Sequence, residues 1–219
     1  MSFSAETVKD LREKTGAGMM DCKKALTETK GDFAAAVTWL REKGIASAAK
    51  RTGKTASEGA VYSYIHMGGK IGVLVEINCE TDFVARGEMF QGFCKEMCLQ
   101  ICSTSPRWLR RDEVPQDVVA AEMEIYKIRA RESGKPENIL EKIATGMMNK
   151  FYEENCLLDQ KFIKDPSVTI ETLVKETSGK AGEKVEIRRF ARYQLGEGIE
   201  KQQSNFAEEV AAAVAASKG

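Results

Sequence analysis

Hydrophobic positions at helical spacing run through the first 43 residues and predict three short helices. Val8 and Leu11 mark the inner face of the first helix, the second begins at Met19, and Asp32 can cap the third. A basic stretch of small residues follows over 44–58 and is typical of a link between domains. The pattern therefore predicts a small three-helix module, of a size that commonly works by binding a partner.

Alternating hydrophobic and polar positions predict a β-hairpin and a later third strand. The hairpin strands are Val61 to Met67 and Lys70 to Cys79, and Gly68-Gly69 between them suits a two-residue turn with positive φ. The third strand covers Glu183 to Leu195, where the step Arg188-Arg189 breaks the alternation and indicates a β-bulge. Four apolar residues of the second strand share one face: Ile71, Val73, Val75 and Ile77.

Two further helices over 117–133 and 137–153 carry apolar residues close to a three-four repeat. The segment Ser133-Gly134-Lys135-Pro136 ends the first helix and starts the second, which predicts an antiparallel coiled-coil hairpin. Because the hairpin leaves and returns within one sheet domain, we expect it to protrude. Other helices are predicted over 88–103, after Asp165-Pro166, and over 206–216.

These elements predict an α+β protein: an N-terminal three-helix module, a small antiparallel sheet packed with helices, a protruding coiled-coil hairpin and a C-terminal helix. We expect the following division: a three-helix module with its link at 1–55, the first segment of the α/β core at 56–113, the hairpin at 114–154, the second segment of that core at 155–200 and a C-terminal helical module at 201–219.

Composition and charge narrow the class of protein. The 219 residues are 42% hydrophobic and 30% charged, which fits a globular protein with a proper core. The formal net charge is zero, so no global field attracts the chain to nucleic acid or membranes. Because the start has no apolar signal region and no apolar stretch is long enough to span a membrane, we expect a cytoplasmic protein without membrane contact.

Six cysteines are present without any C-x-x-C spacing, which argues against a zinc knuckle or a thioredoxin-type motif. Cys94, Cys98 and Cys102 recur every four residues on a predicted helix. They are either a metal or redox ladder or small hydrophobic residues on a buried face. Burial is favoured, because thiols are commonly buried and no histidine lies nearby to complete a metal site.

No catalytic arrangement emerges from the sequence, so we expect a binding protein rather than an enzyme. Gly53-Lys54-Thr55 resembles the end of a P-loop, but Ala48 stands where the motif requires glycine, and a helix precedes it. A cluster of Arg107, Arg110 and Arg111 beside Trp108 is either a contact for single-stranded RNA or a solvated loop.

The turn after the second predicted strand places Asp82 beside the large ring of Phe83. Turns between a strand and a helix lie on the surface, so this ring is either folded back as a plug or offered to a partner. The pattern by itself favours the plug, because large aromatic side chains are usually buried.

Two long motifs bear a resemblance to a known family. Residues 15–26 (TGAGMMDCKKAL) and 78–85 (NCETDFVA) are similar to the two signature motifs of elongation factor Ts. The resemblance covers nearly the whole chain and includes residues 133–136 (SGKP) and 196–201 (GEGIEK). Two long motifs in the right order are highly specific.

The resemblance implies a guanine-nucleotide exchange factor for the translation GTPase elongation factor Tu, with no cofactor of its own. In this family Thr81, Asp82, Phe83 and Val84 would enter the GTP-binding domain, with the ring wedged between helices and the carboxylate disturbing the region that holds Mg²⁺ and the phosphates.

The UBA-like N-terminal module would dock on the same domain. Its expected contact residues are Leu11, Met19, Met20 and Lys23. The sheet would touch a β-domain of the GTPase, and the C-terminal module would reach the GTP-binding domain. Asp82 and Phe83 should then lie on the surface.

One departure from the longer family members is that this chain has strand for only one β-half. A three-stranded sheet leaves exposed edges, so we expect a homodimer joined through these sheets. The alternative function is a ribosome- or RNA-associated adaptor that uses the basic link and the Arg107–Arg111 cluster, although the neutral net charge argues against direct nucleic-acid binding.

Overall fold

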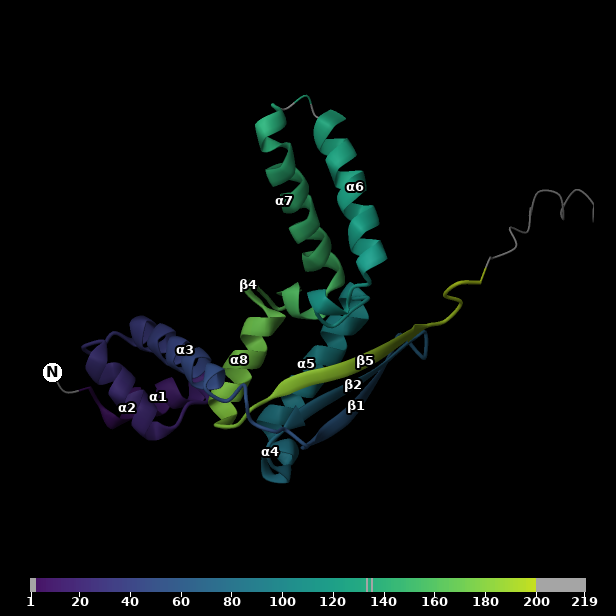
Figure 1. Ribbon diagram of the computed structural model, residues 1–219. Helices are drawn as coiled ribbons and strands as arrows, with labels where there is room; N and C mark the ends of the chain where they lie inside the picture. The colour runs from purple at the N-terminus through teal and green to yellow at the C-terminus, as the bar shows by residue number, and fades with distance from the viewer. Residues whose placement is uncertain (1–2, 133, 135, 200–219) are drawn as a thin grey trace, which may run out of the picture.

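A computed structural model describes residues 3–132, 134 and 136–199 of the chain. Its centre is an antiparallel sheet of three strands in the order β1-β2-β5, formed by Glu58–His66, Ile71–Cys79 and Glu186–Gln194. Helix α5 (Glu88–Thr104) lies along one face of this sheet (Figure 1). The predicted α+β class and the small antiparallel sheet are therefore confirmed.

The strands differ from the predicted hairpin at its turn and agree with the prediction at the bulge. His66 pairs with Ile71, so the connection has four residues instead of two. Met67, Gly68 and Gly69 all have positive φ, and three consecutive residues in this region make a wider loop than a two-residue turn. Further along, Glu76 pairs with Arg189 while the next residue pairs with Ile187, which leaves Arg188 as the bulged residue.

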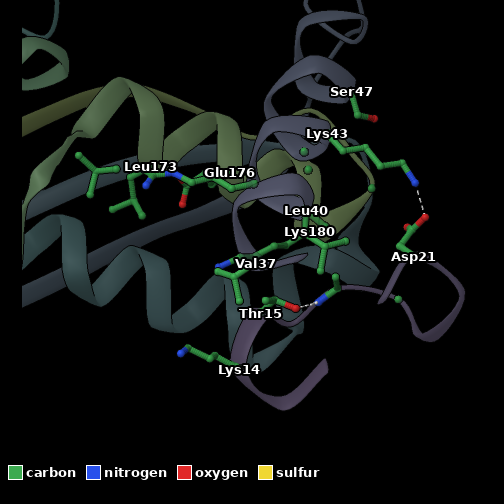
Figure 2. Close-up of a pocket in the computed structure, with 18 of the residues that line it drawn as sticks. Lys14, Thr15, Asp21, Val37, Leu40, Lys43, Ser47, Leu173, Glu176 and Lys180 are labelled. Atoms are coloured by element: carbon green, nitrogen blue, oxygen red, sulfur yellow. Dashed lines mark hydrogen bonds and ion pairs between the residues drawn. The ribbon is translucent and has the colours of Figure 1, made fainter. Parts of the chain in front are cut away.

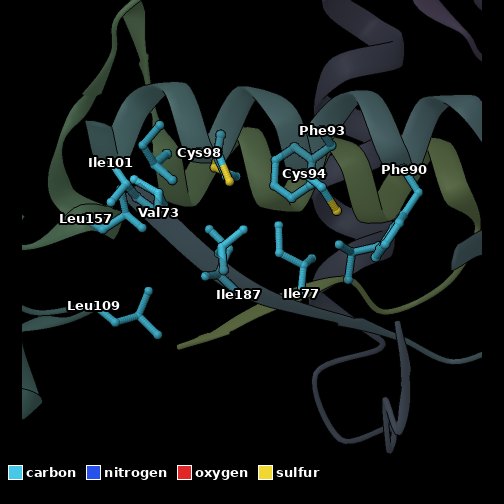
Figure 3. Close-up of a cluster of buried hydrophobic side chains, with 14 of the residues drawn as sticks. Val73, Ile77, Phe90, Phe93, Cys94, Cys98, Ile101, Leu109, Leu157 and Ile187 are labelled. Carbon is cyan, nitrogen blue, oxygen red and sulfur yellow. The ribbon is translucent and has the colours of Figure 1, made fainter. Parts of the chain in front are cut away.

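The main core lies between α5 and the sheet. Val73, Val75 and Ile77 of β2 are at most 2% exposed, as the shared face predicted. Figure 3 shows Phe90, Phe93 and Cys94 of α5 facing this surface, together with Ile187 of β5. Phe90 and Cys94 are completely buried. The hydrophobic effect of joining this helix to the sheet is the main stabilising contribution in this part of the molecule.

The cysteines of α5 are part of that core. Cys94 and Cys98 have no exposed surface and Cys102 is 6% exposed, which confirms that they serve as small buried hydrophobic residues. Burial raises the pKa of the Cys94 and Cys98 thiols to about 12. Among the described residues, no cluster of His, Cys, Asp and Glu could hold a metal ion.

The N-terminal module consists of α1 (Ala5–Thr15), α2 (Met19–Glu28) and α3 (Phe33–Ala49), as predicted. Its core contains the fully buried Leu11 and Leu26. The Asp32 side chain accepts a hydrogen bond from the Ala35 N–H and caps α3. The basic link was expected from residue 44, but α3 continues to Ala49, because its last turns pack on another helix.

That partner is α8 (Ile170–Ala181), which follows a second, two-stranded sheet of β3 (Lys161–Phe162) and β4 (Asp165–Thr169). The sequence pattern did not predict this small sheet. β3 is only two residues long, and β4 has a single buried residue, Val168, so neither strand shows the alternation that predicts a strand. The predicted helix after Asp165-Pro166 is confirmed, and its N-cap is Thr169.

The coiled-coil hairpin consists of α6 (Gln116–Glu132) and α7 (Glu137–Asn155), which protrude from the rest of the molecule in Figure 1. Trp108 and Phe151 pack at its base with ring centroids 6.0 Å apart. Short 3-10 turns flank this base at Arg111–Glu113 and Leu157–Asp159. The predicted helix over 206–216 lies outside the described residues. No helix in the described part of the chain is long and apolar enough to cross a membrane.

Candidate partner-binding site

The candidate site is the turn at the end of β2, where the short helix α4 (Asp82–Arg86) begins. Thr81 is its N-cap, and the Thr81 hydroxyl accepts a hydrogen bond from the Val84 N–H at 3.4 Å. Ala85 is 6% exposed and Val84 packs against the main core, so one side of α4 is anchored. Because Val84 and Ala85 are held against the core, the neighbouring Phe83 is left on the solvent side of α4.

Phe83 is 88% exposed, so its ring does not fold back as a plug. The expectation that Asp82 and Phe83 lie on the surface is confirmed. Covering a phenylalanine ring that stands in water stabilises a complex by roughly 1.5–3 kcal/mol. An exposed aromatic ring on an anchored turn is therefore a strong candidate for a contact with another protein.

Asp82 carries the negative charge of the turn. Its carboxylate lies 2.9 Å from the Arg86 guanidinium, one helical turn later, and both side chains are more than half exposed. An exposed pair at this spacing contributes little to stability. The Asp82 carboxylate is therefore free to exchange Arg86 for groups on a partner.

Two further carboxylates, which the sequence pattern did not single out, bind backbone N–H groups on the two chain segments that meet at this turn. Glu183 accepts hydrogen bonds from the Thr81 N–H at 3.0 Å and from the Thr81 hydroxyl at 2.7 Å. Glu80 accepts hydrogen bonds from the Lys184 N–H at 2.7 Å and from Lys54 Nζ at 3.0 Å. These donors hold the pKa of the Glu80 carboxyl below its usual value. No local pattern could have found Glu183, which is 102 residues from Thr81.

The N-terminal module exposes the proposed methionine contacts but not Leu11. Met19 and Met20 are 53% and 74% exposed at the start of α2, and Lys23 is exposed one turn later. Leu11 has no exposed surface, because it fills the centre of the module. Leu11 therefore cannot contact a partner while the module is folded.

A groove of about 570 Å³ lies where the module meets the rest of the molecule. Figure 2 shows side chains from both α3 and α8 lining it, and they are Val37, Leu40 and Lys43 of α3 and Leu173, Glu176 and Lys180 of α8. Arg41 and Glu176 form an ion pair from α3 to α8, and Lys43 pairs with Asp21. The basic side chains of the groove are thus partly neutralised, and the pair from Arg41 helps to fix the module's orientation.

The arginine cluster suggested for RNA binding is largely occupied by contacts within the chain. Arg110 pairs with Glu113 at 3.1 Å, and Arg111 pairs with Asp159 at 2.6 Å while lying over the Tyr152 ring. Arg107 stacks on Trp108 with its guanidinium carbon 4.2 Å from the ring centroid. These contacts brace the base of the hairpin and favour a structural role for the cluster.

The sheet has a second exposed surface, on the face opposite α5. Cross-strand pairing places Ser63 opposite Leu74 and Ile65 opposite Gly72, and Gly72 pairs in turn with Tyr193. We call this surface the outer sheet face. Its large apolar side chains are 46–78% exposed, and they are Val61, Ile65, Leu74, Tyr193 and Leu195. A patch of this kind is typical of an interaction site.

Comparison with known proteins identifies a family that matches nearly the whole chain. Residues 3–197 match the model of the family described as Elongation factor TS. Elongation factor Ts of Anaeromyxobacter sp. (strain K) is 63% identical over 216 residues, which cover 99% of each chain. Elongation factor Ts of Geobacter sulfurreducens (strain ATCC 51573 / DSM 12127 / PCA) is 58% identical over 213 residues, 97% of this chain and 99% of the relative.

The fold and these similarities define a translation elongation factor. A match over nearly the full length, at this level of identity, then fixes the family. The chain belongs to the elongation factor Ts family.

Proposed function

We propose that this chain is a guanine-nucleotide exchange factor for elongation factor Tu and acts in the cytoplasm during protein synthesis. The single observation that carries the proposal is the exposed Phe83 beside Asp82 on an anchored turn. The family match supports the same role. The factor makes and breaks no covalent bond, so it is not an enzyme in the covalent sense, and it uses no cofactor.

The proposed mechanism is entry of the Thr81–Val84 turn into the GTP-binding domain of the GTPase. The Phe83 ring wedges between helices there, and Asp82 brings a negative charge towards the region that holds Mg²⁺ and the phosphates. Because Mg²⁺ neutralises crowded phosphate charge, disturbing its ligands removes a large share of the affinity for GDP. GDP then leaves and GTP can bind.

Exchange by this route is a coupling between two ligands of one protein, and such coupling is reciprocal. GDP must weaken the binding of the factor as much as the factor weakens the binding of GDP. The factor therefore binds most tightly to the nucleotide-free GTPase, and rebinding of nucleotide releases it.

The N-terminal module provides a second contact with the GTP-binding domain through Met19, Met20 and Lys23. Methionine side chains are flexible and polarisable, which suits them to an adaptable contact surface. The sheet contacts a β-domain of the GTPase, and the C-terminal module beyond residue 200 reaches the GTP-binding domain. The chain is also proposed to form a homodimer through the outer sheet face, which would cover this apolar surface.

The test is the release of fluorescent GDP from elongation factor Tu, with the Phe83→Ala variant beside the natural sequence. We expect the natural chain to accelerate release strongly. Truncating a central aromatic contact typically costs about 2 kcal/mol or more, so Phe83→Ala should lower the acceleration at least about 30-fold. Ile163→Ala is the matched control, since Ile163 is an exposed apolar residue at 41% in the connection between β3 and β4. An unchanged rate in Phe83→Ala would refute the wedge.

A further inference from the structure

Thr81 is hydrogen bonded at each of its polar atoms. Its N–H and its hydroxyl both donate to Glu183, and the same hydroxyl accepts the Val84 N–H. Its carbonyl accepts the Ala85 N–H at 3.2 Å and the Cys79 thiol at 3.1 Å. Thr81 is thus the most constrained point between the end of β2 and the start of α4.

The carboxylate of Glu183 belongs to a reciprocal arrangement at the end of the sheet. Pairing between β2 and β5 stops at Asn78 and Glu186, and the two chain segments then separate. Beyond that point Glu183 receives the Thr81 N–H, while Glu80 receives the Lys184 N–H. Each segment therefore supplies a carboxylate to a backbone N–H of the other. These side-chain acceptors replace the backbone carbonyls of the β-ladder, which has ended.

The exposed ring of Phe83 has little else to fix its direction. At 88% exposure the side chain is surrounded by water, so the backbone of α4 determines where the ring points. Thr81, the N-cap of α4, fixes the start of this backbone, and two hydrogen bonds to Glu183 hold Thr81 in place. A hydrogen bond to a charged acceptor is stronger than one between neutral groups.

We propose that Glu183 is a positioning residue that holds the Thr81–Val84 turn ready for insertion into the GTPase. This inference rests on the proposed function and deepens it, because Glu183 need not touch the partner. A turn that is ordered in advance loses less conformational entropy on binding, and a turn that samples other conformations binds in proportion to its competent fraction.

The experiment compares three variants of the full chain in the GDP-release assay at factor concentrations well below saturation, where the release rate depends on how tightly the factor binds. Glu183→Ala removes both acceptors, and we expect the release rate to fall about tenfold, which corresponds to about 1.4 kcal/mol. Glu183→Gln keeps the side-chain length and one oxygen acceptor, so its rate should lie between the two. Lys184→Ala is the control, because Lys184 contributes its backbone N–H to Glu80 and its side chain pairs instead with Glu186.

Amide hydrogen exchange of the free variants provides the readout that a general loss of stability would not give. In Glu183→Ala, exchange should accelerate in the peptide that contains residues 81–86 and stay unchanged in α5 and β2. A release rate equal to that of the natural chain in Glu183→Ala would overturn the proposal, even with faster amide exchange. An equal loss in Lys184→Ala would overturn it too, since the whole loop would then be responsible.

The exchange function and the positioning role of Glu183 can be refuted separately. If the natural chain does not accelerate GDP release, the exchange function itself is refuted. If the natural chain accelerates release and Glu183→Ala does so equally, only the positioning role of Glu183 is refuted.

Discussion

A turn that binds a partner needs exposed apolar surface and a rigid backbone, and Phe83 and Thr81 each provide one of these. Phe83 supplies apolar surface that is 88% exposed in the free chain. Thr81 supplies rigidity, because Glu183, Val84 and Ala85 all bond to it. An aromatic ring on a mobile loop would lose part of its binding free energy to ordering, whereas this ring stands on backbone that is already ordered.

The buried thiols give a prediction about alkaline stability at the residue scale. Burial raises the pKa of Cys94 and Cys98 from 9.0 to about 12, so the folded chain keeps both protons that the unfolded chain releases above pH 9. The stability contribution is therefore complete below about pH 9 and decreases as the pH rises towards 12. Each thiol should lower the free energy of unfolding by up to about 1.4 kcal/mol per pH unit in that window.

Urea unfolding between about pH 8 and 11 measures this effect, and Cys94→Ala with Cys98→Ala isolates it from the lysines and tyrosines that titrate in the same range. The difference in free energy of unfolding between the natural chain and the double variant should narrow or change sign as the pH rises. Parallel curves would show that these two thiols do not contribute.

At the scale of elements, the crossing of α3 and α8 depends on two glycines. A Cβ added to Gly179 would lie 2.6 Å from the Gly44 Cα and 2.8 Å from the Gly44 carbonyl oxygen. A Cβ added to Gly44 would come no closer than 3.8 Å to the Gly179 Cα, which is an ordinary contact. A side chain at position 179 would therefore collide with the backbone of α3, whereas a Cβ at position 44 has room. Only Gly179 requires glycine.

This asymmetry predicts opposite results for two similar substitutions. Gly179→Ala should destabilise the chain by about 1–3 kcal/mol, because the backbone of α3 must move away. Gly44→Ala should leave stability unchanged or raise it by up to about 1 kcal/mol, because alanine favours a helix. Gly92→Ala in α5 is a second control, since a Cβ there meets nothing within 4 Å.

Chemical denaturation of the three variants checks this prediction. Equal stability of Gly179→Ala and Gly44→Ala would show that α3 and α8 do not cross as closely as in the structure. Because the same crossing orients the N-terminal module, Gly179→Ala should also weaken any contact that depends on Met19 and Met20.

At the scale of the whole molecule, the proposed contact surfaces lie on different regions of the fold. The turn at Phe83 lies at one end of the central sheet, and the N-terminal module with Met20 joins that end through α3 and α8 (Figure 1). The outer sheet face lies on the side opposite α5. A homodimer through that face would therefore leave both copies of the turn free to act.

The dimer is tested by light scattering at micromolar concentration. We expect a mass of twice 24.2 kDa for the natural chain. In a twofold interface each substitution acts twice, so Tyr193→Glu should give a monomer, because Tyr193 is 71% exposed on the outer sheet face near the end of β5. Ile128→Glu, at a 46% exposed position on the hairpin, should remain dimeric. A monomeric natural chain at this concentration would contradict the proposal.

Local patterns in the amino-acid sequence were sufficient to predict the elements that depend on near neighbours. Helical spacing predicted the N-terminal helices and the coiled-coil hairpin, and alternation predicted the buried face of β2. The broken alternation at Arg188-Arg189 predicted the bulge. Each of these features depends on residues within a few positions of one another, so hydrophobic periodicity is sufficient to find it. The two signature motifs indicated the family in the same way.

Whether Phe83 is buried or exposed was settled only by the folded chain, because that depends on what distant segments place beside the turn. Pattern alone favoured a buried plug, whereas the anchoring of Val84 and Ala85 turns the ring outward. The same holds for Glu183, which meets Thr81 across 102 residues, and for Gly179, which meets Gly44. Contacts between segments far apart in sequence produce no periodic pattern along the chain, so only the folded structure reveals them.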